Sequence, residues 1–139
     1  MSTVFAVSRP SNRLNVALWT SQAVLAAFYA AVGIAKLTQP IPDLAAMMVW
    51  PGAAPEWFVR FIGSAELAGA LGLLVPSLSR ILPVLTMVAA AALVLLQVCA
   101  IAFHLSRGEF PMLPFNIVLL AAAAFIAWGR SGPAPISAR

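Results

Sequence analysis

The stretch NVALWTSQAVLAAFYAAVGIA, residues 15–35, runs for 21 residues without a charged side chain. At about 1.5 Å per residue, a helix of this length crosses roughly 30 Å, which is the thickness of the hydrocarbon core of a bilayer. A cleavable signal peptide has a shorter apolar core, roughly 7–15 residues, and precedes a soluble body. Because further apolar segments follow here, the stretch predicts a transmembrane helix.

The composition of the whole chain agrees with a membrane protein. Of the 139 residues, 63% are hydrophobic and only 9% are charged, whereas about a quarter of the residues of a soluble domain are charged. The lipid bilayer is therefore the expected surrounding of most of the surface. The net charge is +4, but the basic residues are scattered singly and form no basic helix, which argues against nucleic acid as a partner.

Prolines and charged residues divide the rest of the chain into three more apolar segments. The predicted spans are residues 15–37, 57–75, 81–105 and 112–128. Four prolines between residues 38 and 56 predict an ordered, Pro-rich outer loop between the first two spans, in which residues 43–49 can form one or two helical turns. Pro76 is expected to close the second span. The predicted fold is all-α, an integral membrane four-helix bundle, flanked by a cytoplasmic segment at 1–14 and a disordered cytoplasmic tail at 129–139.

The distribution of charge predicts the orientation of the bundle. With four spans, the two termini and the turn between the second and third spans share one side of the membrane. That side carries five basic residues and no acidic one, namely Arg9, Arg13, Arg80, Arg130 and Arg139. The other side carries Lys36, Arg60 and Arg107 beside Asp43, Glu56 and Glu109. Because basic residues are enriched in cytoplasmic loops, both termini are expected in the cytoplasm and the protein in the inner membrane.

Polar residues inside the predicted spans fall on single helix faces. At 100° per residue, Gln22, Tyr29 and Lys36 share one face of the first span. Gln97 and His104 share one face of the third span in the same way. An ionisable group inside a span costs at least about 2.5–3.5 kcal/mol on insertion scales, so such groups are expected to face the interior of the bundle.

Glu66 is the deepest of the polar side chains, near the middle of the second span. Asn116 lies about one turn into the fourth span from the outer side, while Lys36 and His104 lie at the outer ends of their spans. These residues therefore belong to the outer half of the bundle. Glu66 needs Lys36, His104 or a proton as its partner.

Small residues mark faces on which helices approach closely. Gly63, Gly69 and Gly72 lie in the second span, and they are expected to contact the first or the fourth span. Ala23, Ala27, Ala31 and Ala35 form a row on the first span that suits self-association or a partner protein.

The polar residues together predict a site for acid–base chemistry on a lipophilic small molecule. The predicted catalytic residues are Glu66, His104 and Lys36, and the predicted substrate-binding residues are Tyr29, Gln97, Asn116 and Gln22. A buried carboxylate near an imidazole and an ammonium group can exchange protons, which suits the proton half of quinone reduction. No metal-ligand pair, phosphate loop or nucleophile motif occurs, so no metal is predicted. One histidine supplies at most one axial ligand to haem, which is weak support for a haem protein, and the cofactor stays unknown.

Several of these residues also have an ordinary structural interpretation. Charged residues at span ends commonly reach the membrane interface, which would account for Lys36, Arg60, Arg107 and Glu109. Gln97 can hold helices together through a hydrogen bond. His104 and Asn116 are open to either interpretation.

Three motifs resemble those of the DoxX-like membrane proteins, which are small four-span proteins. The first is Gly-x-x-Lys-Leu, here Gly33, Lys36 and Leu37. The second is Gly-x-x-Glu-Leu-x-Gly-x-x-Gly-Leu-x-x-Pro, here Gly63, Glu66, Leu67, Gly69, Gly72, Leu73 and Pro76. The third is a histidine followed by Arg-x-Glu, here His104, Arg107 and Glu109, with Asn116 and Trp128-Gly129-Arg130 in the fourth span. The resemblance covers residues 18–130, and Gln97 and Cys99 stand where small or apolar residues are expected.

The resemblance implies a multi-pass membrane protein with a link to redox chemistry, because the family includes a subunit of a thiosulfate:quinone oxidoreductase and partners in thiol-linked membrane redox complexes. Two functions therefore compete. In the first, the protein binds a lipophilic molecule in the outer half of the bundle and performs acid–base or proton-coupled redox chemistry with Glu66 and His104. In the second, it is a non-catalytic anchoring or assembly subunit of a membrane redox complex. A homo-oligomer or a redox partner protein fits either function.

Overall fold

The computed structural model describes residues 10–139, and this part of the chain forms helices and turns without strands. Four helices are long and apolar enough to cross a membrane: α1 (Asn12–Thr38), α3 (Glu56–Ser79), α4 (Val84–Ser106) and α5 (Leu113–Ser131). The prediction of an all-α, four-helix membrane bundle is confirmed. Arg9 and most of the predicted segment 1–14 lie outside the described residues.

Capping groups and prolines set the ends of the long helices. The Ser11 hydroxyl oxygen accepts a hydrogen bond of 3.2 Å from the backbone N–H of Leu14, which caps the start of α1. Pro55 immediately precedes α3, and Pro114 lies in the first turn of α5, where the missing N–H costs little. Arg80 ends α3 in the left-handed conformation, with φ of 59°. The predicted spans therefore agree with the observed helices to within a few residues at most ends.

Pro76 does not end α3, contrary to the prediction. The helix continues to Ser79 with Pro76 buried inside it. Proline has no N–H, so the carbonyl of Gly72 loses its helical donor. The next carbonyl, that of Leu73, accepts a hydrogen bond of 2.7 Å from Gln22 Nε2 on α1. Gln22 therefore joins α1 to α3 close to the proline, but it does not replace the donor that the Gly72 carbonyl lacks.

The predicted outer loop is mostly helical. Between α1 and α3 the chain forms α2 (Ile41–Met48) and a 3₁₀ turn, η1 (Trp50–Ala53), so the helical turns expected at 43–49 are present within a longer helix. Pro40 and Pro42 lie at the start of α2, where proline is tolerated. Leu44 and Pro51 are buried, which holds the segment against the bundle.

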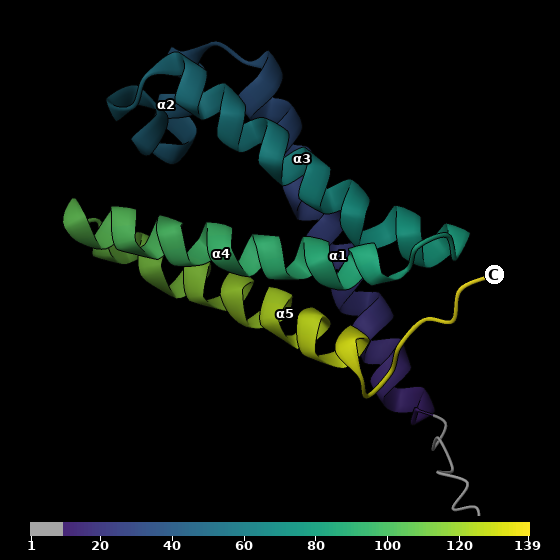
Figure 1. Ribbon diagram of the computed structural model, residues 1–139. Helices are drawn as coiled ribbons and strands as arrows, with labels where there is room; N and C mark the ends of the chain where they lie inside the picture. Colours follow the sequence, from purple (N-terminus) through teal and green to yellow (C-terminus); the bar gives the residue numbers. More distant parts are fainter. Residues whose placement is uncertain (1–9) are drawn as a thin grey trace, which may run out of the picture.

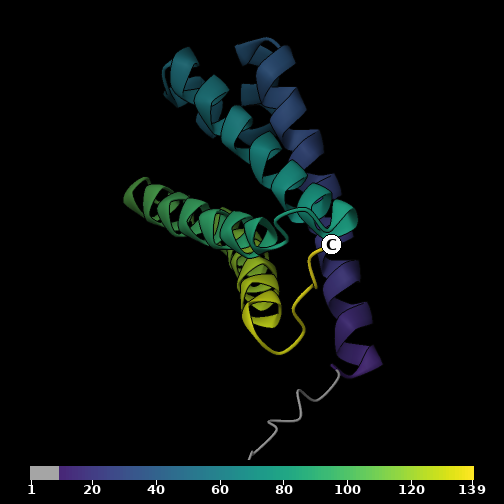
Figure 2. The same cartoon turned by 45° about the vertical axis from the view of Figure 1, so that its right-hand side comes forward.

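The long helices form two pairs. α1 packs mainly on α3, and α4 packs mainly on α5, while contacts between α3 and α4 join the pairs. Figures 1 and 2 show the pairs together at the end that carries the α3–α4 turn and diverging toward the end that carries α2. The two ends of the bundle therefore offer different amounts of space between the helices.

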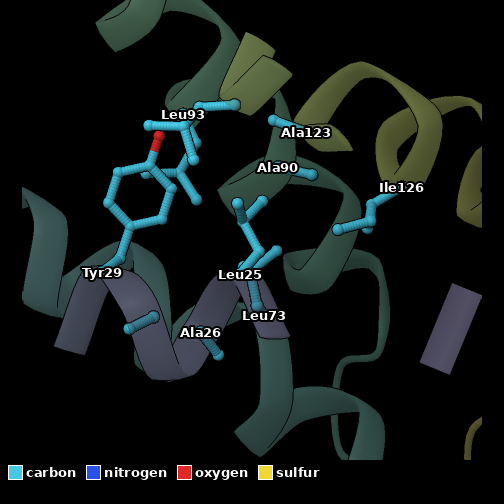
Figure 3. Close-up of a cluster of buried hydrophobic side chains, with 10 residues drawn as sticks. Leu25, Ala26, Tyr29, Leu73, Ala90, Leu93, Ala123 and Ile126 are labelled. Carbon is cyan, nitrogen blue, oxygen red and sulfur yellow. The ribbon is translucent and has the colours of Figure 1, made fainter. Parts of the chain in front are cut away.

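Buried apolar side chains fill the region where the pairs meet (Figure 3). The cluster consists of Leu25, Ala26, Tyr29, Ala70, Leu73, Ala90, Leu93, Leu119, Ala123 and Ile126. Elsewhere large apolar side chains face outward, with Leu95 and Val118 each 64% exposed and Trp57 71% exposed. An exterior of this kind suits lipid rather than water.

Glycines allow close contacts between α3 and its neighbours. A Cβ atom on Gly33 of α1 would lie 2.8 Å from the carbonyl oxygen of Gly63, so the backbones of α1 and α3 touch there. Gly69 and Gly72 lie against side chains of α4. Gly63 thus contacts the first span as predicted, whereas Gly69 and Gly72 contact the third span instead of the first or fourth.

The C-terminal tail lies along the bundle, which differs from the disordered tail predicted for 129–139. The first residues of that range belong to α5, and Ala134 is buried, with its N–H donating to the carbonyl of Gly129 at 2.7 Å. The Arg139 N–H donates to the carbonyl of Arg80 at 3.0 Å, and Arg80 Nε donates to the carbonyl of Ser137 at 2.8 Å. These bonds hold the tail beside the turn between α3 and α4.

Candidate functional site

A buried ion pair joins α1 to α3. Lys36 Nζ donates to both carboxylate oxygens of Glu66, at 2.6 and 2.7 Å. The two side chains are only 6% and 8% exposed. Lys36 lies one turn beyond Gly33 and Glu66 one turn beyond Gly63, so the close backbone contact of these glycines brings the charges together. Of the partners predicted for Glu66, the structure selects Lys36.

Arg60 supports the same end of α1. Its Nη1 donates to the carbonyls of Lys36 and Gln39, at 2.6 and 2.8 Å. Its Nη2 donates to Glu56 at 2.8 Å. The last carbonyls of a helix lack donors within the helix, and a cation is favourable there. Arg60 therefore closes α1, where the sequence indicated only an interfacial residue.

A second charged group lies at the end of α4. His104 Nδ1 is 2.7 Å from one carboxylate oxygen of Glu109, and Arg107 Nε donates to the other at 2.7 Å. Gly108 makes this turn possible with φ of 69°. The hydrogen bonds from Arg107, and then from His104, hold the pKa of Glu109 below its ordinary value. His104 thus pairs with Glu109, an acid that the sequence did not select, and not with Glu66.

The tautomer of His104 follows from this pairing. An ionised carboxylate only accepts hydrogen bonds, so the proton of the neutral imidazole lies on Nδ1 and the carboxylate of Glu109 accepts it. Nε2 then carries a lone pair, and this nitrogen has no hydrogen-bond partner among residues 10–139. His104 is therefore oriented by one acid and keeps its other ring nitrogen available.

Three uncharged polar side chains, those of Tyr29, Gln97 and Asn116, lie near the charged groups. Gln97 Nε2 donates to the Tyr29 hydroxyl at 2.7 Å, and both side chains are buried. Gln97 Oε1 is also buried and has no partner in the described part of the chain. Asn116 Nδ2 donates to the carbonyl of Met112, one turn earlier in the chain, at 3.1 Å. The side chains of Gln97 and Asn116 therefore each keep an oxygen atom that accepts no hydrogen bond from the described residues.

One cavity of about 500 Å³ brings most of the predicted site residues together. Its wall contains Tyr29, Lys36, Glu66, Gln97, His104 and Asn116, and the apolar residues around them include Phe28, Met47, Met48, Trp50, Phe58, Phe103, Phe115 and Leu119. The polar members come from all four long helices. This volume is typical of small-molecule sites, which are mostly apolar with a few placed polar groups.

A second hollow of about 770 Å³ lies between α3 and α4. It shares the side chains of Phe58, Ile62, Leu96 and Cys99 with the cavity. Its other lining residues are small or apolar, and Phe61 among them is 61% exposed. Only a few side chains therefore separate the cavity from the lipid-facing surface between these helices.

Gln22 does not reach the cavity, although it was predicted to bind substrate there. It lies on the face of α1 that carries Tyr29, but nearer the end of the bundle that carries the α3–α4 turn. Gln22 Nε2 donates to the carbonyl of Leu73 at 2.7 Å and to Ser77 Oγ at 3.2 Å, and Gln22 Oε1 accepts from Arg130 Nε at 2.6 Å. Gln22 therefore belongs to a separate polar network.

Arg130 is the centre of that network and was not selected as a site residue from the sequence. Its Nη1 donates to Asn15 Oδ1 and to the carbonyl of Ala134, each at 2.9 Å. Its guanidinium carbon lies 5.2 Å from the centre of the Trp19 ring. The signal that could have identified it is its place in the Trp-Gly-Arg motif at the end of the fourth span.

Comparison with known proteins agrees with the fold and the motifs. The model of the DoxX-like family matches residues 20–126, which is most of the chain. No curated protein and no solved structure matches the chain.

Proposed function

Because the chain belongs to the DoxX-like family and is a multi-pass membrane protein, we propose that it binds a lipophilic small molecule in the cavity and handles protons there. One observation carries the proposal: polar side chains from four helices converge on a single, largely apolar cavity. The end of the bundle that carries α2 would then be the functional end.

His104 is the proton-transfer group of this proposal. Its Nε2 can take up a proton, and the carboxylate of Glu109 on the other ring nitrogen stabilises the imidazolium that forms. Glu66 and Lys36 neutralise each other as an ion pair, and a proton passed from Lys36 to Glu66 would leave both uncharged. The three residues therefore offer proton donors and acceptors in the wall of one cavity.

Quinone-linked chemistry is the redox reaction that suits this site and agrees with the family. Reduction of a quinone to a hydroquinol consumes electrons and protons in equal number. The residues of this chain would bind the ring and supply the proton half, while a redox partner protein would supply the electrons.

A non-catalytic anchoring or assembly subunit is the second candidate function. The observation in its favour is that the charged groups at the cavity already have protein partners, Lys36 with Glu66 and His104 with Glu109. Paired polar groups of this kind can set the register of packed membrane helices. This candidate requires no small molecule in the cavity.

Filling the cavity separates these two functions. We expect Ala100→Trp to weaken binding of a benzohydroquinone with a decyl chain by at least about tenfold, because Ala100 lines the cavity and the indole would occupy its space. Calorimetric titration of the purified protein in detergent measures the affinity. Ala102→Trp, on the exposed side of the same helix, is the matched control and should bind as the wild type does. Binding that is unaffected by Ala100→Trp would place the ligand elsewhere, and no binding by any variant would favour the anchoring function.

We infer from the basic residues that both termini face the cytoplasm of an inner membrane. In a Cys99→Ala background, a cysteine at Ser137 should be protected from a membrane-impermeant maleimide in intact cells, and a cysteine at Ala53 in η1 should be labelled. Both positions are exposed, so accessibility within the fold does not limit labelling. The reverse pattern would invert the orientation.

A further inference from the structure

The cavity offers hydrogen-bond acceptors that the protein itself does not use. The amide of Asn116 donates through Nδ2 to the Met112 carbonyl. A carbonyl can only accept, so the amide cannot be reversed without losing this bond. Asn116 Oδ1 is therefore an acceptor, and it has no partner among the described residues.

His104 provides the second acceptor. Because Glu109 accepts the Nδ1 proton, the neutral ring presents a lone pair on Nε2. His104 lies in the last turn of α4 and Asn116 in the first turns of α5, so both lie near the short turn that joins these helices. The two acceptors thus occupy the same end of the cavity wall.

The Tyr29–Gln97 pair adds one donor and one acceptor. Gln97 Nε2 donates to the Tyr29 oxygen, which leaves the Tyr29 proton and the buried Gln97 Oε1 unused. Reversing the amide would make Tyr29 the donor and would leave a lone pair of the Tyr29 oxygen and both N–H groups of Gln97 unused. A group that both donates and accepts matches this pair in either orientation.

The charges around the cavity favour a ligand whose hydrogen-bond donor is uncharged. Glu66 is occupied by Lys36, and Glu109 by His104 and Arg107. An ammonium ligand would be buried without a free counter-charge, which is costly. A hydroxyl group needs no counter-charge, and it both donates and accepts.

We propose that the ligand of this cavity is a lipophilic alcohol, phenol or hydroquinol whose hydroxyl group donates its proton to one of the two acceptors, His104 Nε2 or Asn116 Oδ1. This inference rests on the proposed function and names the chemical class of its ligand. A molecule of the same shape without an O–H group leaves both acceptors of the cavity wall unpaired, and sites built to bond a hydroxyl discriminate strongly against such analogues.

A matched pair of probes tests the inference. We expect para-nonylphenol to bind the purified wild-type protein at least about tenfold more tightly than 1-fluoro-4-nonylbenzene, which has nearly the same shape and lacks the donor. Titration calorimetry in the same detergent gives both affinities. His104→Phe and Asn116→Leu each remove one acceptor at similar size, and the variant that removes the acceptor of the hydroxyl proton should reduce the ratio of the affinities. Val118→Leu lies on the outer side of α5, where Val118 is 64% exposed, and should leave the ratio unchanged.

Each outcome distinguishes the inference from the proposed function. Equal affinity of the wild type for both probes would overturn the hydroxyl inference and leave binding in the cavity intact. Failure of both probes to bind would contradict the proposed function together with the inference. A preference for the phenol that survives unchanged in both acceptor variants would show that other groups recognise it. Because the two variants lie on different helices, loss of folding in one still leaves the other as a test.

Discussion

Glu66→Gln is expected to lower the free energy of unfolding by about 3–5 kcal/mol, whereas Lys36→Met combined with Glu66→Gln should lose much less. The single substitution leaves the Lys36 ammonium without its counter-charge, although its side chain is only 6% exposed. Removing both charges leaves no unpaired ion, and replacing a buried ion pair by uncharged groups of similar volume is often neutral.

A double-mutant cycle measures this coupling. The four proteins of the cycle are the wild type, Lys36→Met, Glu66→Gln and the double variant, each unfolded by a denaturing detergent and followed by circular dichroism. Glu56→Gln is the control, because that carboxylate pairs with Arg60 but is 65% exposed, and exposed pairs contribute little. If Glu66→Gln unfolds at the same point as the wild type, the Lys36 charge is stabilised by something other than Glu66.

Gly33→Leu is expected to destabilise the bundle by about 3 kcal/mol or more, at the upper end of overpacking costs. Its Cβ atom would lie 2.8 Å from the carbonyl oxygen of Gly63 and 3.0 Å from the N atom of Leu67. Both are backbone atoms of α3, so no side chain can rotate away and the two helices must separate. That separation would also pull Lys36 from Glu66.

Gly69→Leu should cost less, because the first obstacle there is the flexible end of the Leu93 side chain, 2.7 Å from the added Cβ atom. Gly132→Leu is the matched control, since no atom of residues 10–139 lies within 4 Å of an added Cβ atom at that position. Thermal unfolding of the three variants in one detergent gives the order of stability. An equal loss in Gly33→Leu and Gly132→Leu would contradict the close contact of α1 with α3.

Helix positions and helix faces were the most predictable features of the sequence. The thickness of the bilayer sets a minimum length for each apolar run, so the four spans are found within a few residues at most ends. The 100° spacing also holds, because Gln22, Tyr29 and Lys36 are all buried on one face of α1. The position of each polar side chain along the helix axis was harder to predict. The 14 residues from Gln22 to Lys36 extend about 21 Å along the axis, so one face serves two separate polar networks.

The choice of neighbours could not be read from the periodicity. A helical face shows which residues point inward but not which helix they meet, so Gly69 was assigned to the wrong neighbour and Glu66 kept several candidate partners. Glu66 pairs with Lys36 because two glycines let α1 and α3 touch, and His104 pairs with Glu109 because of the turn at Gly108. Pro76 was expected to end a helix because proline lacks the N–H that an interior position donates, yet α3 continues through it to Ser79.

The hollow between α3 and α4 bears on how a ligand would be selected. Only a few side chains, Ile62 and Leu96 among them, separate it from the cavity, so a molecule dissolved among the acyl chains would need to displace only these side chains to enter from the lipid. Such a molecule leaves one hydrocarbon environment for another, and the hydrophobic effect then contributes almost nothing to its transfer. The polar atoms of the cavity wall would then determine which of the molecules dissolved in the membrane bind. Occupancy would accordingly follow the mole fraction of the ligand in the lipid phase rather than its concentration in the surrounding water.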